Sequence, residues 1–501
     1  MKNLYLFLML FSLSLTAQNH VGSIDIDYKN SFYSDKESIN ISNDKTNELV
    51  FLVDDTDKTI ITLLDNQFKK INTLETEELN NKFKKFIGYS ISGDTYTVFF
   101  KDNKDKKFGY VDFNFKTQKV TQSKIELKFE SEKFVEGITH NNIFYLMTVD
   151  KKTDNVNFYE FTNDKSFLKH PVSFYHAVYT SDGMGSTKHP YEILTSSAWS
   201  GNSGSLTKID LNMPNSIETT SDKVKLYQIE DELIFTFDNQ NTKTKVISIN
   251  TKDFTSKEYD FDKPKLMDDS FSSSDNSFIN NGILYQAICS SDEMILTVKY
   301  LKNNNLIKEF TVYNDIDTIE FKNSPIIQEN SSIWFKDNKR VRELEKSSKF
   351  LRKVSNGKLG IVAFPLNNNI QLTIGGYTER SGGGFGGMPM MGGGIPMGGF
   401  ALGGGFTGTM SFNPFMSAYN SYSYTKSTRI ECLFDTSFNH VEGEISKNIF
   451  DKIHEHEKII EVEKRYDLGL NRKNVFRHNN RFYLSYIDER NKKYHIIEFS
   501  E

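Results

Sequence analysis

Short apolar runs alternate with polar tips along most of the chain, and one hairpin pattern returns several times. Each copy has an apolar strand, a polar tip that opens with Asp, and a second strand rich in apolar or aromatic residues. The clearest tips begin at Asp54, Asp102, Asp150, Asp238 and Asp488, and the first three are evenly spaced along the chain. The longer gap between the third and fourth tips predicts one divergent unit around Trp199.

The second copy of the pattern predicts four strands, at 86–92, 95–101, 108–115 and 120–127. The second of these strands is apolar or aromatic at consecutive positions, Val98, Phe99 and Phe100. Successive side chains of a strand point to opposite faces, so both faces of this strand are apolar. Such strands are buried on both sides.

A repeat of about 40 to 50 residues that holds four short strands resembles a β-propeller blade. The resemblance covers most of the chain from position 45 to 501 and implies an all-β fold in which every blade lies between two neighbours. Weaker copies at Asp292, Asp337 and Asp435 bring the tips to between seven and nine, and two tips can share one blade. The sequence therefore predicts a propeller of about seven four-stranded blades, with eight as the alternative. No motif of a narrower propeller family is present.

The ends of the chain are expected to close the ring. Residues 19 to 44 are predicted to pair with the last strand, at 494–499, which would remove exposed strand edges. The recurrent Asp of the tips fits the chemistry of tight turns. The alternative is a repeated calcium site, but the tips lack the Gly that a calcium loop requires at its sharp bend.

A charge-free insertion interrupts the late repeats from Ser381 to Thr425. Between Ser381 and Gly408, half of the positions are Gly, and Met and Phe are interspersed with them. The flanks at 370–378 and 427–434 predict paired strands, so the insertion is expected to be a long loop from one hairpin. Gly-rich chain is flexible, Met adapts to irregular apolar surfaces, and exposed apolar chain usually has a partner.

This loop is therefore predicted to be a contact arm for a protein, a membrane surface or a second copy of the chain. The alternative is a low-complexity loop without a partner. The residues expected to make the contact are Met388, Met390, Met391, Met397, Phe400 and Phe406.

The amino-terminal segment, 1–17, has the pattern of a secretory signal peptide. Lys2 precedes an apolar run from Leu4 to Leu15, and small residues lead to a predicted cleavage after Ala17. The run is shorter than the roughly 20 residues of a membrane-spanning helix. Gln18 is not the Cys that a bacterial lipid anchor requires. We expect an exported bacterial protein, in the periplasm, at the cell surface or outside the cell, without a membrane span.

Composition fits a folded globular protein, with 37% hydrophobic and 13% aromatic residues. Lys and Arg number 61 against 66 Asp and Glu, for a net charge of -5, which argues against nucleic acid as a partner. Cys289 and Cys432 are the two cysteines. Export would permit a disulfide between them, whereas their apolar surroundings favour two buried thiols.

Candidate catalytic and metal-binding residues are few. His454 and His456 would share a face on a strand and could hold zinc, but the apolar spacing from Ser446 to Glu457 predicts a helix, on which they point apart. Gly201 to Ser205 is similar to the nucleophile loop of trypsin-like proteases, except for Asn202 where those have Asp. No base can be assigned to it, and a Gly/Ser turn is the preferred interpretation. No catalytic residue, metal or cofactor is predicted.

Three functions remain open on the sequence. The preferred one is a non-catalytic exported propeller that binds a protein or a cell-envelope component, with the insertion as its contact arm. The first alternative is a propeller enzyme that acts on glycans or peptides with side chains gathered from several inner strands. The second is a surface or adhesive protein that self-associates through the insertion. Asp, Glu, His or Arg side chains converging in a central channel would favour the enzyme.

Overall fold

The computed structural model describes most of the chain after position 17. The described residues are 18–26, 38–54, 58–77, 85–177, 179–180, 187–195, 206–267, 273–330, 340–366, 368–378, 414–423, 426–463, 471–488 and 491–500. The predicted leader, 1–17, lies outside them, so its removal and the export of the chain stay predictions.

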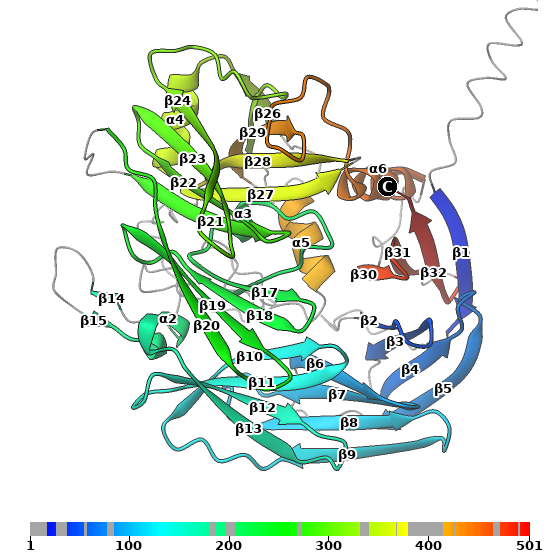
Figure 1. Cartoon of the computed structure of the whole chain (residues 1–501). Helices are drawn as coiled ribbons and strands as arrows, with labels where there is room; N and C mark the ends of the chain where they lie inside the picture. Colours follow the sequence, from blue (N-terminus) through cyan, green and yellow to red (C-terminus); the bar gives the residue numbers. More distant parts are fainter. Residues whose placement is uncertain are drawn as a thin grey trace, which may run out of the picture.

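Sheets of four or five strands follow one another along the described chain and surround a central region (Figure 1). The first three contain β2 (Ser38–Asn43), β3 (Glu48–Asp54), β4 (Lys58–Leu64) and β5 (Lys70–Glu77), then β6 (Lys85–Ser92), β7 (Thr95–Lys101), β8 (Phe108–Asn114) and β9 (Lys119–Ile125), then β10 (Glu132–His140), β11 (Ile143–Asp150), β12 (Asn155–Phe161) and β13 (Phe167–Ser173). The next two contain β16 (Thr207–Ile209), β17 (Val224–Ile229), β18 (Glu232–Phe237), β19 (Lys243–Asn250) and β20 (Ser256–Asp262), then β21 (Ser274–Asn280), β22 (Ile283–Cys289), β23 (Glu293–Tyr300) and β24 (Leu306–Tyr313).

The last two sheets have less regular strand orders. One is ordered β26-β25-β29-β28-β27, and the other joins β30, β31 and β32 to the first strand of the chain, β1. Their strands are β25 (Ile326–Asn330), β26 (Arg340–Leu344), β27 (Lys358–Leu366), β28 (Asn369–Tyr377), β29 (Ser427–Phe434), β30 (Asn471–His478), β31 (Arg481–Asp488), β32 (Lys493–Phe499) and β1 (Gln18–Asp25). The prediction of an all-β, propeller-like architecture is confirmed at this level.

Helices and two short strands occupy the connections. They are the 3-10 helix η1 (Tyr175–Ala177), α2 (Pro190–Thr195), α3 (Ile217–Thr220), α4 (Ser347–Ser355), α5 (Pro414–Ser423) and α6 (Ile449–Glu463), with the two-stranded sheet of β14 (Tyr179–Thr180) and β15 (Thr187–Lys188). None of the helices in the described part of the chain is long and apolar enough to cross a membrane.

The predicted four-stranded second unit is the sheet β6–β9, and each of its strands begins and ends close to the expected bounds. Its strand β7 is buried on both faces, as predicted. Tyr96, Val98 and Phe100 share one buried cluster with Val50 of the preceding sheet. Phe99 points the other way and stacks on Phe144 of the next sheet, with 3.8 Å between ring centroids. One strand therefore contributes to two cores.

The first and last strands of the chain pair with each other, as predicted. β1 runs antiparallel to β32, with Gln18 opposite Phe499 and Asp25 opposite Lys493. Tyr494 of β32 stacks on Phe51 of the next sheet, with ring centroids 4.2 Å apart. The two ends of the chain are therefore held by backbone hydrogen bonds and by a shared apolar cluster.

Two of the recurrent Asp residues have the predicted role in turns. Asp102 Oδ1 accepts hydrogen bonds from the backbone N–H groups of Lys106, at 2.7 Å, and Lys107, at 3.1 Å. Asp150 Oδ1 accepts from Lys152 N–H at 2.6 Å. These bonds fix the reversal of the chain, and the carboxylates need no cation to explain their recurrence.

Asp238, at the corresponding position of a later repeat, is instead fully buried. It forms an ion pair with the equally buried Lys225, with 3.0 Å between Oδ2 and Nζ. Thr244 Oγ1 donates to its other oxygen at 2.6 Å, and Ser277 Oγ of the next sheet donates at 2.7 Å. Burial alone would raise the pKa of Asp238, but Lys225 and Lys263 hold it well below its ordinary value. This carboxylate joins two neighbouring sheets.

The divergent unit expected around Trp199 is not a four-stranded sheet within the described residues. That region contains β14, β15 and α2, and its strand β16 joins the sheet of β17–β20 in parallel. The repeat spacing overestimated the number of units here because a long connection has a length similar to that of a blade. Two of the weaker tips also share one sheet, since Asp435 follows β29 and Asp337, which lies outside the described residues, falls between β25 and β26.

The hairpin that carries the insertion is confirmed, since β28 and β29 pair antiparallel. Residues 379–413 lie outside the described part, including all six predicted contact residues. The end of the insertion differs from the expected loop, because Pro414–Ser423 forms helix α5. Its Ala418 and Tyr419 are buried against Phe450 of α6 and Val475 of β30. Apolar residues at helical spacing explain why this part of the insertion folds into the core.

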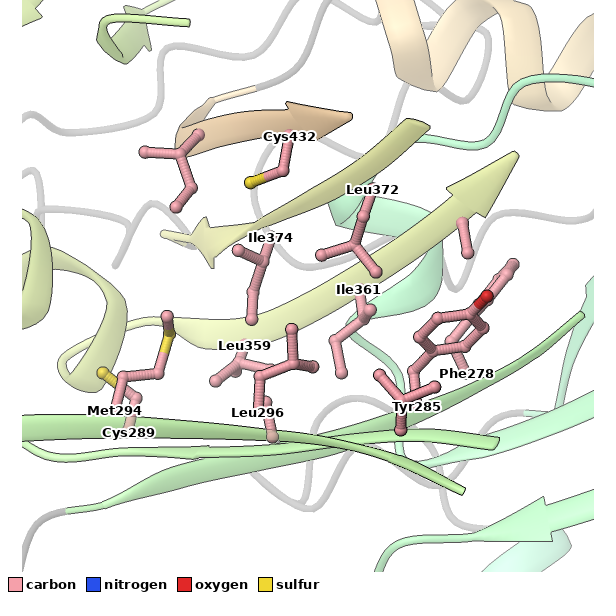
Figure 2. Close-up of a cluster of buried hydrophobic side chains, with 14 of the residues drawn as sticks. Phe278, Tyr285, Cys289, Met294, Leu296, Leu359, Ile361, Leu372, Ile374 and Cys432 are labelled. Atoms are coloured by element: carbon pink, nitrogen blue, oxygen red, sulfur yellow. The ribbon is translucent and has the colours of Figure 1, made fainter. Parts of the chain in front are cut away.

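Cys289 and Cys432 are free thiols, and both are buried. Figure 2 shows them in one apolar cluster with Met294, Leu359 and Ile374. Burial raises the pKa of both thiols, which keeps them protonated and unreactive. The interpretation as buried thiols is therefore confirmed over the disulfide.

Truncating an aromatic side chain between two sheets should be costly. We expect Phe99→Ala to lower the free energy of unfolding by about 3–5 kcal/mol, because it empties space on a strand that has no solvent-facing side. Urea unfolding followed by circular dichroism measures the change. Ile71→Ala, on an outer strand with a half-exposed side chain, is the control and should change the value by less than about 0.5 kcal/mol.

Replacing one partner of the buried ion pair should lower the free energy of unfolding more than replacing both partners. We expect Asp238→Asn to lower the free energy of unfolding by about 3–5 kcal/mol, because Lys225 is left charged without a carboxylate. Adding Lys225→Met should recover part of that loss. Equal free energies of unfolding for the single and double variants would contradict the expectation that Lys225 is destabilising once its carboxylate partner is lost.

Candidate functional site

The first strands of several sheets converge on one cavity of about 360 Å³. Its walls come from β2, β6, β10, β16, β17 and β30, which belong to five different sheets, and from Phe415 of α5. Side chains gathered in this way come from both ends of the chain, such as Asn40 and Asn480.

Two glycines allow the inner strands to approach each other at this cavity. A side chain at Gly137 would place its Cβ 2.1 Å from the backbone oxygen of Ile87. Gly88 has a φ of +155°, and a Cβ there would lie 2.6 Å from the ring of Phe144. Gly88 borders the β-bulge of β6, and Gly137 lies one residue beyond the β-bulge of β10. The backbone of β6 and β10 therefore forms part of the cavity wall directly.

Asparagines of two hairpin turns line the same cavity. Asn141 and Asn142 connect β10 to β11, and Asn479 and Asn480 connect β30 to β31. All four have positive φ, between 49° and 65°. Two-residue hairpin turns require this conformation at both central positions, and Asn adopts it more readily than other non-glycine residues. The turn chemistry that joins the strands thus also supplies amide groups to the cavity.

A buried histidine stands at the centre of a short hydrogen-bond chain. His478 Nδ1 lies 2.7 Å from Ser42 Oγ, and Ser42 Oγ donates to Asp44 Oδ1 at 2.9 Å. Asn479 Nδ2 lies 3.1 Å from His478 Nε2. Because the hydroxyl of Ser42 donates to Asp44, we assign Nδ1 as the donor of the ring to Ser42 Oγ, which leaves Nε2 to accept from Asn479 Nδ2.

The pKa of His478 is lowered from its ordinary value of 6.5. Burial is the main cause, since it disfavours the charged ring, and the negative charge of Asp44 opposes it in part. The imidazole is therefore neutral at pH 7, in the form that can act as a base.

Asp210 brings to the cavity a carboxyl group whose pKa is raised, whereas the pKa of His478 is lowered. Burial raises its pKa above the ordinary 3.8, while Asn212 and the charge of Arg477 oppose the rise. Its Oδ1 accepts from the backbone N–H of Asn212 at 2.9 Å. Lys208, which precedes it on β16, is held 3.2 Å from Glu136. A carboxyl group with a raised pKa can remain protonated and donate a hydrogen bond or a proton.

Aromatic side chains provide the apolar part of the wall. Tyr89, Phe415 and Phe476 line the cavity together with the amides. The backbone N–H of Tyr89 donates to Thr139 Oγ1 at 2.8 Å, which ties β6 to β10. The cavity therefore combines flat apolar faces with amide, carboxyl and imidazole groups.

A second cavity, of about 40 Å³, lies between α3, α5 and the sheet of β27–β29. Its charged groups satisfy one another, since Arg429 contacts Glu329 at 3.0 Å and Glu431 at 3.2 Å. Burial raises the pKa of the neighbouring Tyr422, and Asp451 adds to the rise. A space of this size accommodates water molecules rather than a substrate.

The residues singled out from the sequence lie elsewhere. The six Met and Phe residues of the insertion and the loop from Gly201 to Ser205 are outside the described residues. His454 and His456 lie on α6, which confirms the helix, and His454 Nδ1 is 3.9 Å from Glu457 of the same helix. Within the described ranges, no three His, Cys, Asp or Glu side chains gather as metal ligands.

The residues of the cavity were missed because none stands in a local motif. A usable signal was present in the paired asparagines, Asn141-Asn142 and Asn479-Asn480, which occupy equivalent turns in two repeats. A second was the glycine inside the inner strands, at Gly88 and Gly137.

No protein family matches the sequence, and no curated protein is similar to it. Solved structures do match in part. A mutant of Synechocystis apocarotenoid oxygenase aligns with 53% of this chain and 58% of its own, at 7% identity and a TM-score of 0.27. A chimera of that oxygenase with RPE65 aligns over the same shares, at 7% identity and a TM-score of 0.26. A prolyl endopeptidase aligns with 67% of this chain and 45% of its own, at 9% identity and a TM-score of 0.29.

The chain spans less than two thirds of the length of each of these structures. Their names are those of enzymes, and they contradict the preferred hypothesis of a non-catalytic propeller that binds a protein or envelope component. That hypothesis is withdrawn in favour of the enzyme alternative. With TM-scores of 0.26 to 0.29, these structures carry no functional argument for this chain. Self-association through the insertion stays a prediction.

The protonation of His478 can be measured directly. We expect its ring to titrate below pH 6.5 in histidine-selective NMR, because burial disfavours the charged form. Asp44→Asn should lower the midpoint further, since it removes the negative charge that favours protonation. A midpoint above 6.5, or a rise in the variant, would contradict this electrostatic description.

Proposed function

We propose that this chain is a seven-bladed propeller enzyme that hydrolyses glycans, with the 360 Å³ cavity as its active site. One observation carries the proposal, namely that a carboxyl group with a raised pKa and an imidazole with a lowered pKa line the same cavity. Pairs of titratable groups whose environments favour a neutral acid and a neutral base are typical of acid–base catalysis at a single site.

The wall of the cavity favours a polyhydroxylated substrate. The four turn asparagines present amide groups that both donate and accept, which suits sugar hydroxyls. Tyr89, Phe415 and Phe476 offer apolar surface against which the C–H face of a sugar ring can pack. A peptide substrate is the alternative. The hydrolysis described below uses water as the nucleophile, so it requires no serine or cysteine nucleophile.

Hydrolysis needs one proton donor and one acceptor. Protonated Asp210 gives its proton to the glycosidic oxygen as the bond from that oxygen to the anomeric carbon breaks. A water molecule that displaces the Asn479 amide from His478 Nε2 gives a proton to this nitrogen, and the water oxygen bonds to the same carbon. Ser42 and Asp44 hold the ring through Nδ1 and favour the imidazolium that forms. Arg477, beside Asp210, favours the carboxylate that remains after transfer.

The predicted signal peptide supports a place outside the cytoplasm, where structural and nutrient glycans are accessible to an exported hydrolase. This part of the proposal rests on the segment 1–17 alone. Amino-terminal sequencing of the exported protein would test it, with Gln18 as the expected first residue.

The activity should have a bell-shaped dependence on pH. The catalytic form requires neutral His478, so the rate rises with pH through a pKa below 6.5, and protonated Asp210, so it falls through a pKa above 3.8. The rate should therefore peak between the two apparent pKa values of the pair. Release of reducing ends from a panel of polysaccharides, measured from pH 3 to pH 9, gives the profile.

Variants of the two groups separate catalysis from binding. We expect Asp210→Asn and His478→Gln each to lower kcat by about 10²-fold or more, with melting temperatures near that of the parent chain. Asp253→Asn, an exposed turn carboxylate, is the control and should retain full activity. Reducing-end release that survives in both site variants, or cleavage of peptides in place of glycans, would overturn the proposal.

A further inference from the structure

Two histidines from opposite ends of the chain meet on the strand pair that joins its ends. His20 of β1 and His495 of β32 lie with 2.9 Å between Nε2 of the first and Nδ1 of the second. Their ring centroids are 5.2 Å apart at an angle of 63°. A β-bulge between His20 and Gly22 shifts the register and brings the two rings together across the strands.

The surroundings of this pair suit a ligand site that opens to solvent. His20 is exposed, and His495 is partly exposed and stacked on Tyr486, with ring centroids 5.2 Å apart. The stacked tyrosine holds one ring in place while the other can adjust. Neutral imidazole is a preferred ligand for zinc, and two ring nitrogens on a tetrahedral zinc ion stand about 3.3 Å apart at Zn–N distances of about 2.05 Å. To bind the ion, the pair must open by a few tenths of an ångström and both rings must turn so that their nitrogens point at one common position.

We propose that His20 and His495 bind a zinc ion that clamps the first strand of the chain to the last. Two imidazole nitrogens occupy two of the four positions, and water fills the others on the exposed side. The ion would link His20 of β1 to His495 of β32, in addition to the backbone hydrogen bonds between these two strands. This inference is independent of the glycan-hydrolysing site, which lies on β2, β6, β10, β16, β17 and β30 and uses neither histidine.

Zinc titration tests the site on the full chain carrying no polyhistidine tag. We expect one zinc ion to bind at pH 7.5 in isothermal titration calorimetry and to raise the unfolding midpoint. His20→Asn and His495→Asn should each weaken zinc affinity at least about tenfold and abolish the rise.

His176→Asn is the matched control, since this exposed histidine lies on η1 beside Glu258 and away from the closing strands. It should leave zinc binding unchanged. Melting without zinc shows whether each variant folds, so loss of binding can be assigned to the lost ligand. Equal zinc affinity in the parent chain and in both site variants would overturn the proposal, as would loss of affinity in His20→Asn alone.

Discussion

The structure depends on strands that are apolar on both faces. In β7, neighbouring residues such as Val98 and Phe99 enter different cores, one shared with the preceding sheet and one with the next. No such sheet can bury its surfaces alone, so each requires a neighbour on either side. The same requirement applies at the ends of the chain, where Phe51 stacks on Tyr494 and the first strand completes the last sheet. Interdependence of this kind explains why units with little sequence in common adopt one arrangement.

The sequence predicted the parts of the fold that repeat locally. Strand bounds in β6–β9 and the pairing of β1 with β32 follow from apolar alternation and from the need to cover edges. It failed where a long connection imitated a repeat, around Trp199, and where apolar helical spacing was hidden in a low-complexity segment, at Tyr419 of α5. The cavity was not predicted, because its residues meet only when several sheets are placed around one region, and the paired asparagines that hint at it form no local motif.

Turn chemistry has different consequences in different repeats. Asp102 and Asp150 accept backbone hydrogen bonds at exposed tips, as short polar side chains do in many turns. Asp238 begins a comparable tip, yet three lysines and the neighbouring sheet surround it, and it becomes part of a buried network. The paired asparagines likewise satisfy a backbone requirement first, since their positive φ values fit two-residue hairpins. Their position at the inner ends of the sheets then gives the cavity its amide groups.

One physical cause explains why the cavity holds both an acid and a base. Burial disfavours whichever form of a group is charged, so it raises the pKa of Asp210 and lowers that of His478. Burial thereby favours the neutral form of both groups. Local partners then oppose the effect of burial, Arg477 for the carboxyl group and Asp44 for the imidazole, and these partners favour the charged products of proton transfer. In the proposed hydrolysis, the same arrangement would keep both groups neutral before a proton moves and stabilise their charged forms once it has moved.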